Sequence, residues 1–483
     1  MELSRLVDRL RGELEGYTVA GVAESVGRVG LAALDREQRA PAIRHACALP
    51  GRIPLLTRLL LLGHQLTEEE YTEALPTIPL DEAIDAGFMT EHIKAAIAVR
   101  PVAIPERHGS GELLIASDLG PLQDCLPAHD HVMPVGGATK TLAAMTAFDA
   151  SQHVLDLGTG CGYHALVAAR SGANAVAVDI SERALAFTQF NAAMAGLTVE
   201  TRQGSLFEPV PEKFDRIVAN LPFVITPPEV RRVIGTYEYR DAGAEGDDIL
   251  MEVLANVGNH LSENGIAWLL GNWLIHADLD SPTFATTWSK TIATAIGNRE
   301  AWIVLRDAVD PAQYAEMWLK DTGMTGSAFT MAYFEWLKNI AAESIGFGCL
   351  TLGPQDGPQR FEDYRGSMAD SFGDAWRNRH LAASEDDALL ATHLVANGLV
   401  EKRLHTPGVS DPWHISLLGL GREVPVSGEV AGFVGACDGE LSVGQIIGAL
   451  SGLLNTPVDE MMAAILPSAR ELIGAGLLVE YSS

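Results

Sequence analysis

Two polar motifs that could do chemistry follow short apolar segments in the middle of the chain. The first is Asp156-Leu-Gly158-Thr-Gly160-Cys-Gly162, which lies between the apolar segment 153–157 and a helical pattern. A strand, a glycine-rich turn and a helix in this order open a nucleotide-binding sheet. The spacing is G-x-G-x-G after an acid, whereas a dinucleotide site more often has G-x-G-x-x-G. The motif therefore suits a ligand without phosphates, S-adenosylmethionine (SAM), better than NAD.

The second motif is Asn220-Leu-Pro-Phe223, which ends the apolar segment 214–219. The amide side chain offers a hydrogen-bond acceptor, and the phenyl ring offers a flat face for stacking. Between the two motifs, the segment 175–178 leads to Asp179, 21 residues after Gly158, where a carboxylate can bind ribose hydroxyls. The three signals are specific together, although each one alone is weak.

With these motifs, residues 154–223 resemble the class I SAM-dependent methyltransferases, specifically those with an Asn-Pro-Pro-Tyr/Phe motif. Enzymes of that kind methylate planar nitrogens, in glutamine side chains of release factors or in exocyclic amines of nucleobases. The resemblance implies an α/β fold with a doubly wound, mostly parallel, seven-stranded sheet. The layout of the chain also resembles a group of long actinobacterial-type methyltransferases with winged-helix-like flanking domains.

The resemblance gives the catalytic roles to Asn220, Leu221, Pro222 and Phe223. Asn220 Oδ1 and the Leu221 carbonyl would accept hydrogen bonds from the acceptor NH₂ group and counter the delocalisation of its lone pair. Pro222 keeps Leu221 extended, and Phe223 would stack on a planar substrate. Methyl transfer otherwise requires mainly alignment of the reacting atoms. The chain departs from the family at Leu221, where proline is commoner, and at Phe223, which lacks a tyrosine hydroxyl.

The predicted cofactor is SAM, whose methionine end the glycine motif would surround. Asp179 would bind the ribose, and Ile180 would pack on the adenine. Ser205 stands where the family often has an acid for the adenine amine, so its hydroxyl or the Leu206 backbone must serve. The segment before the first strand could also bind the methionine end, although a plain helix entry capped by Thr139 weighs equally. The predicted cofactor contacts are Gly136, Gly137, Thr139, Thr141, Asp156, Gly158, Thr159, Gly160, Asp179, Ile180, Ser205, Leu206 and Asn220.

Substrate contacts are expected on loops at the carboxyl ends of the strands. The candidates are Phe223, Tyr237, Tyr239, Arg240, Asn272 and Trp273. The two tyrosines and the arginine could recognise a polar or anionic group, but a solvated loop explains them equally well. Asn272 and Trp273 follow a strand predicted to end at residue 270 and could wall the pocket. A lone tryptophan there is as often a core residue.

Alternating apolar and amphipathic segments predict the sheet that carries these motifs. The expected strands are 153–157, 174–179, 198–202, 214–219, 265–270, 300–306 and 345–352. The expected helices are 140–148, 162–171, 182–195, 247–260, 283–295, 311–320 and 327–343. Such alternation is typical of a parallel sheet that is covered on both faces. The resemblance implies that the last strand is inserted antiparallel.

Breaks at proline and glycine residues between the helical and strand patterns predict three domains. They are an N-terminal helical or winged-helix-like domain at 1–125, the methyltransferase domain at 126–353 and a C-terminal winged-helix-like domain at 361–483. Pro354–Arg360 is rich in proline, glycine and polar residues, as linkers are. Thr67 and Glu70 predict a capping box in the first domain. The last domain is expected to contain a helix at 387–397, a hairpin from 399, helices at 442–450 and 458–474, and a strand at 477–481.

The net charge of −29 bears on the substrate. Residues 1–105 hold 15 acidic and 11 basic side chains, and residues 361–483 hold 17 and 7. A protein that grips a nucleic-acid backbone needs a basic face, so RNA and DNA are disfavoured as substrates. The expected partner is a small-molecule, peptide or protein methyl acceptor, and a homodimer stays open.

Five scattered cysteines without a C-x-x-C pair predict neither disulfides nor a metal site. No apolar run is long enough to span a bilayer and no signal peptide is apparent, which predicts a cytoplasmic enzyme. The expected activity is N-methylation of an amide or amine. An O- or C-methyltransferase of a natural-product pathway, an RNA N-methyltransferase and a non-catalytic SAM-binding regulator stay open. An NAD-dependent oxidoreductase is disfavoured by the glycine spacing.

Overall fold

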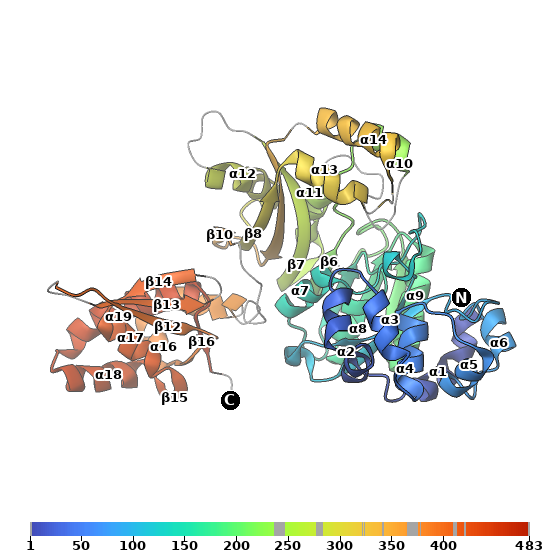
Figure 1. The fold of residues 1–483 in the computed structure, drawn as a ribbon. Helices are drawn as coiled ribbons and strands as arrows, with labels where there is room; N and C mark the ends of the chain where they lie inside the picture. The colour runs from blue at the N-terminus through green and yellow to red at the C-terminus, as the bar shows by residue number, and fades with distance from the viewer. Residues whose placement is uncertain are drawn as a thin grey trace. The chain divides into compact units, whose positions relative to one another are not determined.

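The computed structural model of the chain (Figure 1) describes residues 2–235, 247–276, 284–320, 322, 324–340, 342–364, 375–376, 378–408, 413–419 and 422–481. The chain divides into two compact units. The first contains residues 1–143 and 147–363, and the second contains residues 144–146 and 364–483. None of the helices in the described ranges has both the length and the apolar character that a bilayer-crossing segment requires.

The first unit is built around one eight-stranded sheet. Its strands are β3 (His153–Leu157), β4 (Asn174–Asp179), β5 (Glu200–Gln203), β6 (Phe214–Asn220), β7 (Leu261–Ile275), β8 (Ala301–Val309), β9 (Ser344–Leu352) and β10 (Gln359–Asp363). They lie in the order β10-β8-β9-β7-β6-β3-β4-β5, and only β9 runs antiparallel to its neighbours. The expected α/β fold, with a mostly parallel sheet and an antiparallel inserted strand, is confirmed.

The helices of this unit alternate with the strands. They include α8 (Tyr163–Arg170), α9 (Glu182–Ala195), α11 (Asp248–Asn256) and α12 (Phe284–Ile296). The central strand β3 is mostly apolar and buried: Val154, Leu155 and Leu157 are all 0% exposed. Strands of this kind need cover on both faces, which the alternating helices provide. Strands β3 and β4 and helix α9 have the bounds that the sequence predicts.

Three expectations about the elements are wrong. The sheet has eight strands rather than seven, because β10 pairs in parallel with β8 where a linker was expected to end. The first compact unit continues to Asp363 and so includes β10. Strand β7 ends at Ile275, five residues beyond the expected end at 270, because β9 pairs with it as far as Ile275. The expected helix at 387–397 stops at Ala391, and His393–Ala396 is strand β11 instead.

The N-terminal part of the first unit is helical. Its helices are α1 (Val7–Glu13), α2 (Val19–Leu34), α3 (Ala40–Ala46), α4 (Arg52–Leu56), α5 (Glu68–Ala74) and α6 (Leu80–Asp85), followed by the antiparallel pair β1 (Ala98–Ala103) and β2 (Glu112–Ser117). The capping box is confirmed, since Thr67 Oγ1 accepts from the Glu70 N–H and Glu70 Oε2 accepts from the Thr67 N–H. Three short helices and an antiparallel pair follow the order expected of a winged helix. Residues 1–143 nevertheless pack within the same unit as the large sheet.

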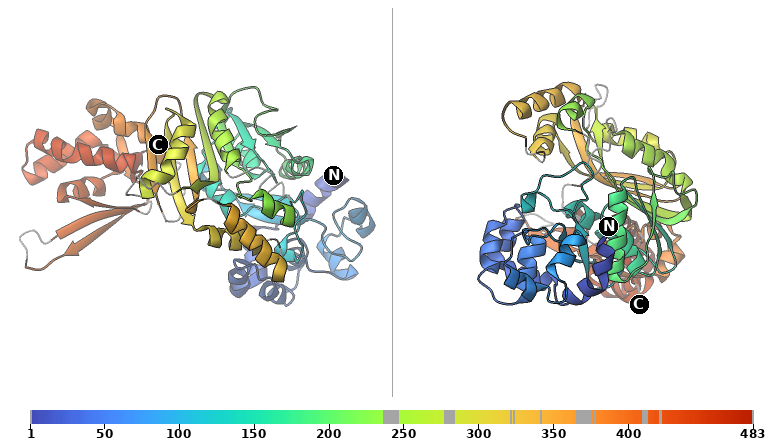
Figure 2. Two further views of the ribbon diagram at one scale, coloured as in Figure 1. Left: turned by 90° about the horizontal axis from the view of Figure 1, so that it is seen from above. Right: turned by 90° about the vertical axis from the view of Figure 1, so that its right-hand side faces the viewer.

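The second unit contains two small sheets and a set of helices, seen from two further sides in Figure 2. One sheet has the order β15-β11-β16, with β15 at Asp438–Ser442 and β16 at Leu478–Glu480. The other has the order β12-β13-β14, at Val400–His405, Trp413–Gly419 and Arg422–Val426. The helices include α17 (Gly428–Gly435), α18 (Val443–Leu454) and α19 (Val458–Gly474). The expected hairpin, both long helices and the final strand are therefore present.

Candidate active site

The glycine motif forms the turn between β3 and α8. Gly158, Gly160 and Gly162 have φ values of +72°, +54° and +85°, a region that favours glycine. The N–H groups of Gly158 and Thr159 donate to the Val178 carbonyl of β4, at 2.9 and 3.0 Å. These bonds fix the turn against the neighbouring strand, so its backbone can face a ligand without rearrangement.

Two of these glycines serve different purposes. A Cβ added at Gly162 would lie 2.8 Å from the side chain of Thr188 and 3.0 Å from its Cα, so this glycine allows α9 to approach the turn. A Cβ added at Gly160 would meet no atom of the described residues within 4 Å. Among these residues the space beside Gly160 is therefore open, as a ligand-binding turn requires.

Asp156 lies beneath the turn rather than on it. Its side chain is 1% exposed, and its Oδ2 accepts from Thr159 Oγ1 at 2.6 Å and from the Ala165 N–H at 3.0 Å. Burial raises the pKa of this carboxyl to about 7. Because both contacts are internal, Asp156 and Thr159 support the turn and the start of α8, and their side chains do not face a ligand.

Asp179 ends β4 next to the turn. Its Oδ2 accepts from the Gly160 N–H and its Oδ1 accepts from the Ser181 N–H, both at 2.9 Å. A carboxylate has about four lone-pair sites and can accept from more than one donor at a time. The next side chain, Ile180, is apolar and yet 54% exposed. A carboxylate beside an uncovered apolar side chain matches the ribose and adenine roles predicted for these residues.

The loop after β5 also reaches this corner. The Gly204 N–H donates to the Asp179 carbonyl at 3.1 Å, and Leu206 has a positive φ of 48°. Ser205 is exposed, and its N–H donates to Glu208 Oε2 at 3.4 Å. Glu208 thus places a carboxylate in the loop where the family often has an acid, although three residues later, and the sequence analysis missed it.

Two polar residues of α9 were also missed. Thr188 Oγ1 donates to the Gly160 carbonyl at 3.2 Å. Asn191 Nδ2 donates to the Cys161 carbonyl at 2.8 Å and to the Ala116 carbonyl at 2.9 Å. Both side chains are 0% exposed, so they tie the turn to α9 and to β2. Their signal in the sequence is two polar residues, three positions apart, on the apolar face of a predicted helix.

Cys161 is buried within the motif, and burial raises the pKa of its thiol to about 12. The thiol is therefore protonated at neutral pH and poorly suited to act as a nucleophile. Cys161 is therefore better interpreted as a small residue that the turn tolerates.

Asn220 ends β6 at the same edge of the sheet. Its Nδ2 donates to Thr139 Oγ1 at 3.3 Å. Its Oδ1 is covered and has no hydrogen-bond partner in the part of the chain that the structure describes. A buried acceptor without a donor is costly, so it is expected where a ligand supplies the donor.

Thr139 lies in the first turn of α7, which spans Gly137–Met145. The helix was expected to begin at residue 140, but it begins at Gly137, and the Lys140 N–H donates to the Gly136 carbonyl. Of the two alternative roles of Thr139, the helix cap is therefore ruled out. Thr139 contacts the catalytic motif instead. Gly136 and Gly137 are exposed at the start of this helix, and Thr141 is half-buried.

Leu221 connects the two motifs. Its side chain is 5% exposed, and its Cδ2 would lie 3.1 Å from a Cβ added at Gly158. The residue that departs from the family pattern therefore packs on the glycine turn. Pro222 and Phe223 are only partly buried, which leaves the ring of Phe223 able to stack on a substrate.

Of the other proposed substrate contacts, two are buried and three lie outside the described residues. Asn272 is 1% exposed and Trp273 is 0% exposed, so neither lines a pocket. A Cβ added at Gly348 would lie 2.3 Å from the Trp273 ring, which packs across β9. The physical reason is that β7 continues beyond both residues, which places them inside the sheet rather than at its rim. Tyr237, Tyr239 and Arg240 lie outside the described residues.

Comparison with known proteins agrees with this geometry. Residues 134–236 match the family described as the methyltransferase small domain, and residues 15–100 match a domain of unknown function. The release factor glutamine methyltransferase of Agrobacterium fabrum is 30% identical over 226 residues, which are 44% of this chain and 76% of that protein. The chain belongs to the class I methyltransferases with a methyltransferase small domain.

Other relatives of this methyltransferase match over a shorter part. The release factor glutamine methyltransferase of Gloeobacter violaceus is 35% identical over 24% of this chain and 44% of that protein. The ribosomal protein L11 methyltransferase of Lactobacillus johnsonii is 31% identical over 27% of this chain and 36% of that protein. The chain thus spans less than half the length of these two relatives. A solved ribosomal protein L11 methylase of Lactobacillus delbrueckii is 20% identical with a TM-score of 0.24, over 44% of this chain and 75% of that one.

The methyltransferase fold implies SAM as the cofactor, and the residues present fit it. The open space at Gly160 would admit the methionine chain. Asp179 places a carboxylate beside the turn, the type of group that binds ribose hydroxyls, and Ile180 offers an exposed apolar surface for a base. Asn220 is linked to the turn through its neighbour Leu221, whose side chain lies against Gly158.

Proposed function

We propose that this methyltransferase transfers a methyl group from SAM to a side-chain amide nitrogen of a protein. The observation that carries the proposal is the buried Oδ1 of Asn220, which has no hydrogen-bond partner among the described residues, while the NH₂ group of the same side chain is held by Thr139. A side chain in this state is prepared to accept a hydrogen bond from an N–H donor. An amide NH₂ group supplies such a donor on the reacting atom itself.

The proposed chemistry addresses the weak nucleophilicity of an amide nitrogen. Its lone pair is delocalised into the carbonyl, so it is a poor nucleophile. When bound, SAM supplies a methyl group on a positively charged sulfur. Asn220 Oδ1 and the Leu221 carbonyl would each accept one N–H of the acceptor amide, fix its plane and stabilise the positive charge that develops on nitrogen. Phe223 would lie against the flat face of the amide.

A protein acceptor is supported by the relatives and by charge. The relatives are named for release factor glutamine and for ribosomal protein L11. The net charge of −29 opposes close approach of a nucleic-acid backbone. A cytoplasmic location, in which such acceptors occur, is part of the proposal. So are a homodimer and the winged-helix character of the two flanking regions.

The assignment of cofactor contacts is also part of the proposal. Gly158, Gly160, Asp179 and Ile180 would contact SAM directly, with the loop at Ser205 and Leu206 beside the adenine. Asp156 and Thr159 would act by holding the turn.

The test is transfer of a radiolabelled methyl group from SAM to purified release factor and to purified ribosomal protein L11. The full chain is compared with Asn220→Ala. We expect one of the two proteins to be labelled, and the label to depend on Asn220. Labelling of neither protein, with labelling of an RNA fraction instead, would contradict the proposal.

A further inference from the structure

The connection between β8 and β9 is far longer than the sheet requires. The two strands are antiparallel neighbours that pair as far as Val309 and Ile345. Such strands can be joined by about two to five residues. Here the chain forms α13 (Pro311–Lys320) and α14 (Gly326–Asn339) after the end of β8 and before the start of β9 (Figure 1). Because Val309 ends β8, these helices lie at the carboxyl edge of the sheet, where Asn220 also lies.

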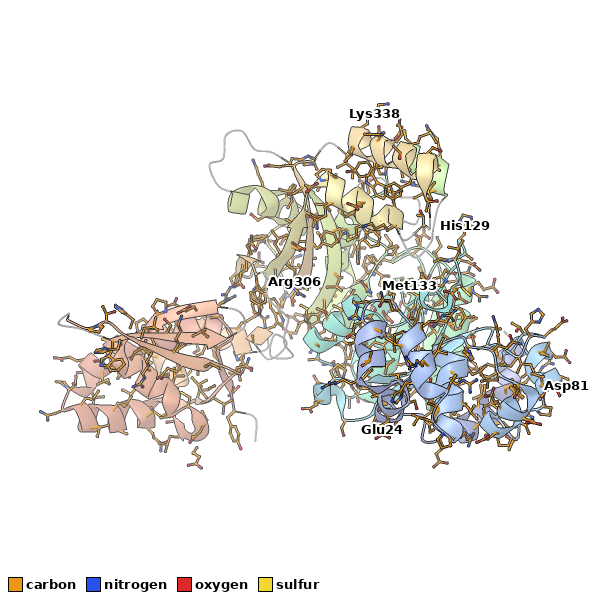
Figure 3. The ribbon with its side chains drawn as sticks, in the orientation of Figure 1. Glu24, Asp81, His129, Met133, Arg306 and Lys338 are labelled. Carbon is orange, nitrogen blue, oxygen red and sulfur yellow. The ribbon has the colours of Figure 1, made fainter. Side chains whose placement is uncertain are left out.

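The inserted helices pack on the segment that follows the catalytic motif. That segment leads into α10 (Pro228–Ile234), which lies against α14. One apolar cluster joins them, and Lys338 lies on its outer side, pointing away from the sheet (Figure 3). The fully buried members of the cluster are Val230, Tyr314, Ala315, Leu319, Ala332, Trp336 and Ile345. The loop that presents the acceptor contacts therefore rests on the insertion.

One hydroxyl makes the polar connection inside this apolar cluster. Tyr314 Oη accepts from the Ile225 N–H at 2.9 Å and from Asn272 Nδ2 at 3.2 Å. Ile225 is two residues beyond Phe223, and Asn272 lies in β7. Tyr314 is 0% exposed, and its ring is held by Trp318, Trp336 and Phe347 at centroid distances of 6.1, 6.1 and 5.8 Å. The packing of these three aromatic rings therefore fixes the position of the Tyr314 hydroxyl.

We propose that Tyr314 is a positioning residue for methyl transfer, which holds the loop from Leu221 to Thr226 in the geometry that presents its acceptors. The inference rests on the proposed function and adds a residue to it. Asn220 is carried by β6, but Leu221, Pro222 and Phe223 lie beyond the strand and need another support. The Ile225 N–H bond to Tyr314 supplies it. Misplacement of catalytic contacts by about 1 Å can cost a large factor in rate, so loss of this support should act on turnover.

The variant that tests this is Tyr314→Phe, which keeps the ring and its apolar contacts. It leaves the Ile225 N–H and the Asn272 amide without their buried acceptor. We expect kcat for the protein acceptor to fall by about tenfold, with the Kd of SAM unchanged. Hydrogen exchange of the Ile225 amide should become faster, a result that does not depend on the acceptor.

Tyr71→Phe is the matched control. Tyr71 is also buried, and its hydroxyl donates to the Ile78 carbonyl at 3.0 Å in the N-terminal helices. The control should lower Tm by a similar amount and leave kcat unchanged when both variants are assayed well below Tm. If Tyr314→Phe behaved like Tyr71→Phe, the residue would be structural only and the inference would be overturned.

A third variant separates failure of this inference from failure of the proposed function. If Asn220→Ala were inactive while Tyr314→Phe kept the wild-type kcat and normal exchange at Ile225, only the role of Tyr314 would be lost. If Asn220→Ala and Tyr314→Phe both retained the wild-type kcat, the role of Tyr314 and the proposed amide methylation through Asn220 would both be overturned. A fall in kcat for both variants, together with faster exchange at Ile225, supports the inference.

Discussion

The cofactor end and the acceptor end of the site are built in different ways. At the cofactor end, the contacts run between residues close in the chain: the Gly160 N–H meets Asp179 and Thr159 meets Asp156, 19 and 3 positions apart. At the acceptor end, Asn220 meets Thr139 across 81 positions and Ile225 meets Tyr314 across 89. The first end is thus built mainly by one strand-turn-helix unit, the neighbouring strand and α9, whose Asn191 also reaches β2, whereas the second requires the whole unit to fold.

This difference predicts that substitutions at the two ends have different effects. The cofactor end uses mainly backbone groups, which a side-chain substitution elsewhere leaves in place. The acceptor end uses side chains of four elements, β6, α7, β7 and α13, that meet only in the folded protein. We therefore expect substitutions at the cofactor end to change SAM binding, and substitutions at the acceptor end to change turnover.

The largest effect is expected for Asn220→Ala. Removal of one preorganised contact to the transition state typically costs about 10²-fold in kcat/KM. The Kd of SAM should change little, because the cofactor is held by the turn and by Asp179. Steady-state kinetics and isothermal titration with the same preparation measure both. An equal loss in SAM binding would erase the distinction between the two ends.

Gly160→Val is expected to act in the opposite way. The valine side chain would occupy the open space beside the turn, at a residue whose φ of +54° already favours glycine. SAM binding should weaken by at least about tenfold, or about 1.4 kcal/mol. Valine at this φ should cost about 1–3 kcal/mol of stability, but the fold should be retained, since no atom of the described residues lies within 4 Å of the new Cβ. Wild-type affinity in isothermal titration would remove the basis for placing the cofactor here.

Asp156→Asn tests the support beneath the turn through pH. Burial raises the pKa of Asp156 to about 7, above its unfolded value, so the folded state binds the proton more tightly. The stability from this group is present at low pH and is lost as pH rises through about 7. Asparagine can accept the same two hydrogen bonds and cannot ionise.

The variant should therefore gain stability relative to the wild type, by roughly 2 kcal/mol between pH 5 and pH 7. Urea denaturation at the two pH values measures the difference. A constant difference between the two proteins would mean that Asp156 is ionised in the folded state throughout this range.

Leu221→Pro is expected to have the smallest effect on turnover. Proline restores the commoner family residue and keeps the carbonyl acceptor. It removes the side chain that packs on Gly158, so unfolding should become easier by about 1–3 kcal/mol. Turnover should stay within about twofold of wild type, as for a change that leaves the transition-state contacts in place. A large loss of kcat would show that the Leu221 side chain, and not only its carbonyl, positions the acceptor.

The contrast between the two ends also explains what the sequence could predict. The glycine turn, Asp179 and Asn220 stand at short and characteristic spacings, so their positions follow from local patterns. Strands β3 and β4 and helices α9 and α13 have the expected bounds, because each is a short segment with a clear period. The antiparallel place of β9 followed from the family resemblance.

The errors fall where partners distant in the chain decide the structure. Trp273 belongs to the core because β9 pairs with β7 beyond residue 270, which the residues of β7 alone do not reveal. Proline and glycine suggested a linker before β10, but its pairing with β8 decides the outcome. Tyr314 sits on an ordinary amphipathic helix, and nothing in its local sequence indicates contact with Ile225. The side chain of Asp156 points beneath the turn, an orientation that the spacing of the motif does not encode.

The most direct test of amide methylation is the chemical position of the transferred methyl group. The release factor or ribosomal protein that accepts the label is digested, and the methylated peptide is sequenced by tandem mass spectrometry. The acceptor arrangement at Asn220 predicts the methyl group on a side-chain amide nitrogen, and its absence after reaction with Asn220→Ala. A methyl group on a carboxylate oxygen or on carbon, formed equally by Asn220→Ala, would contradict it.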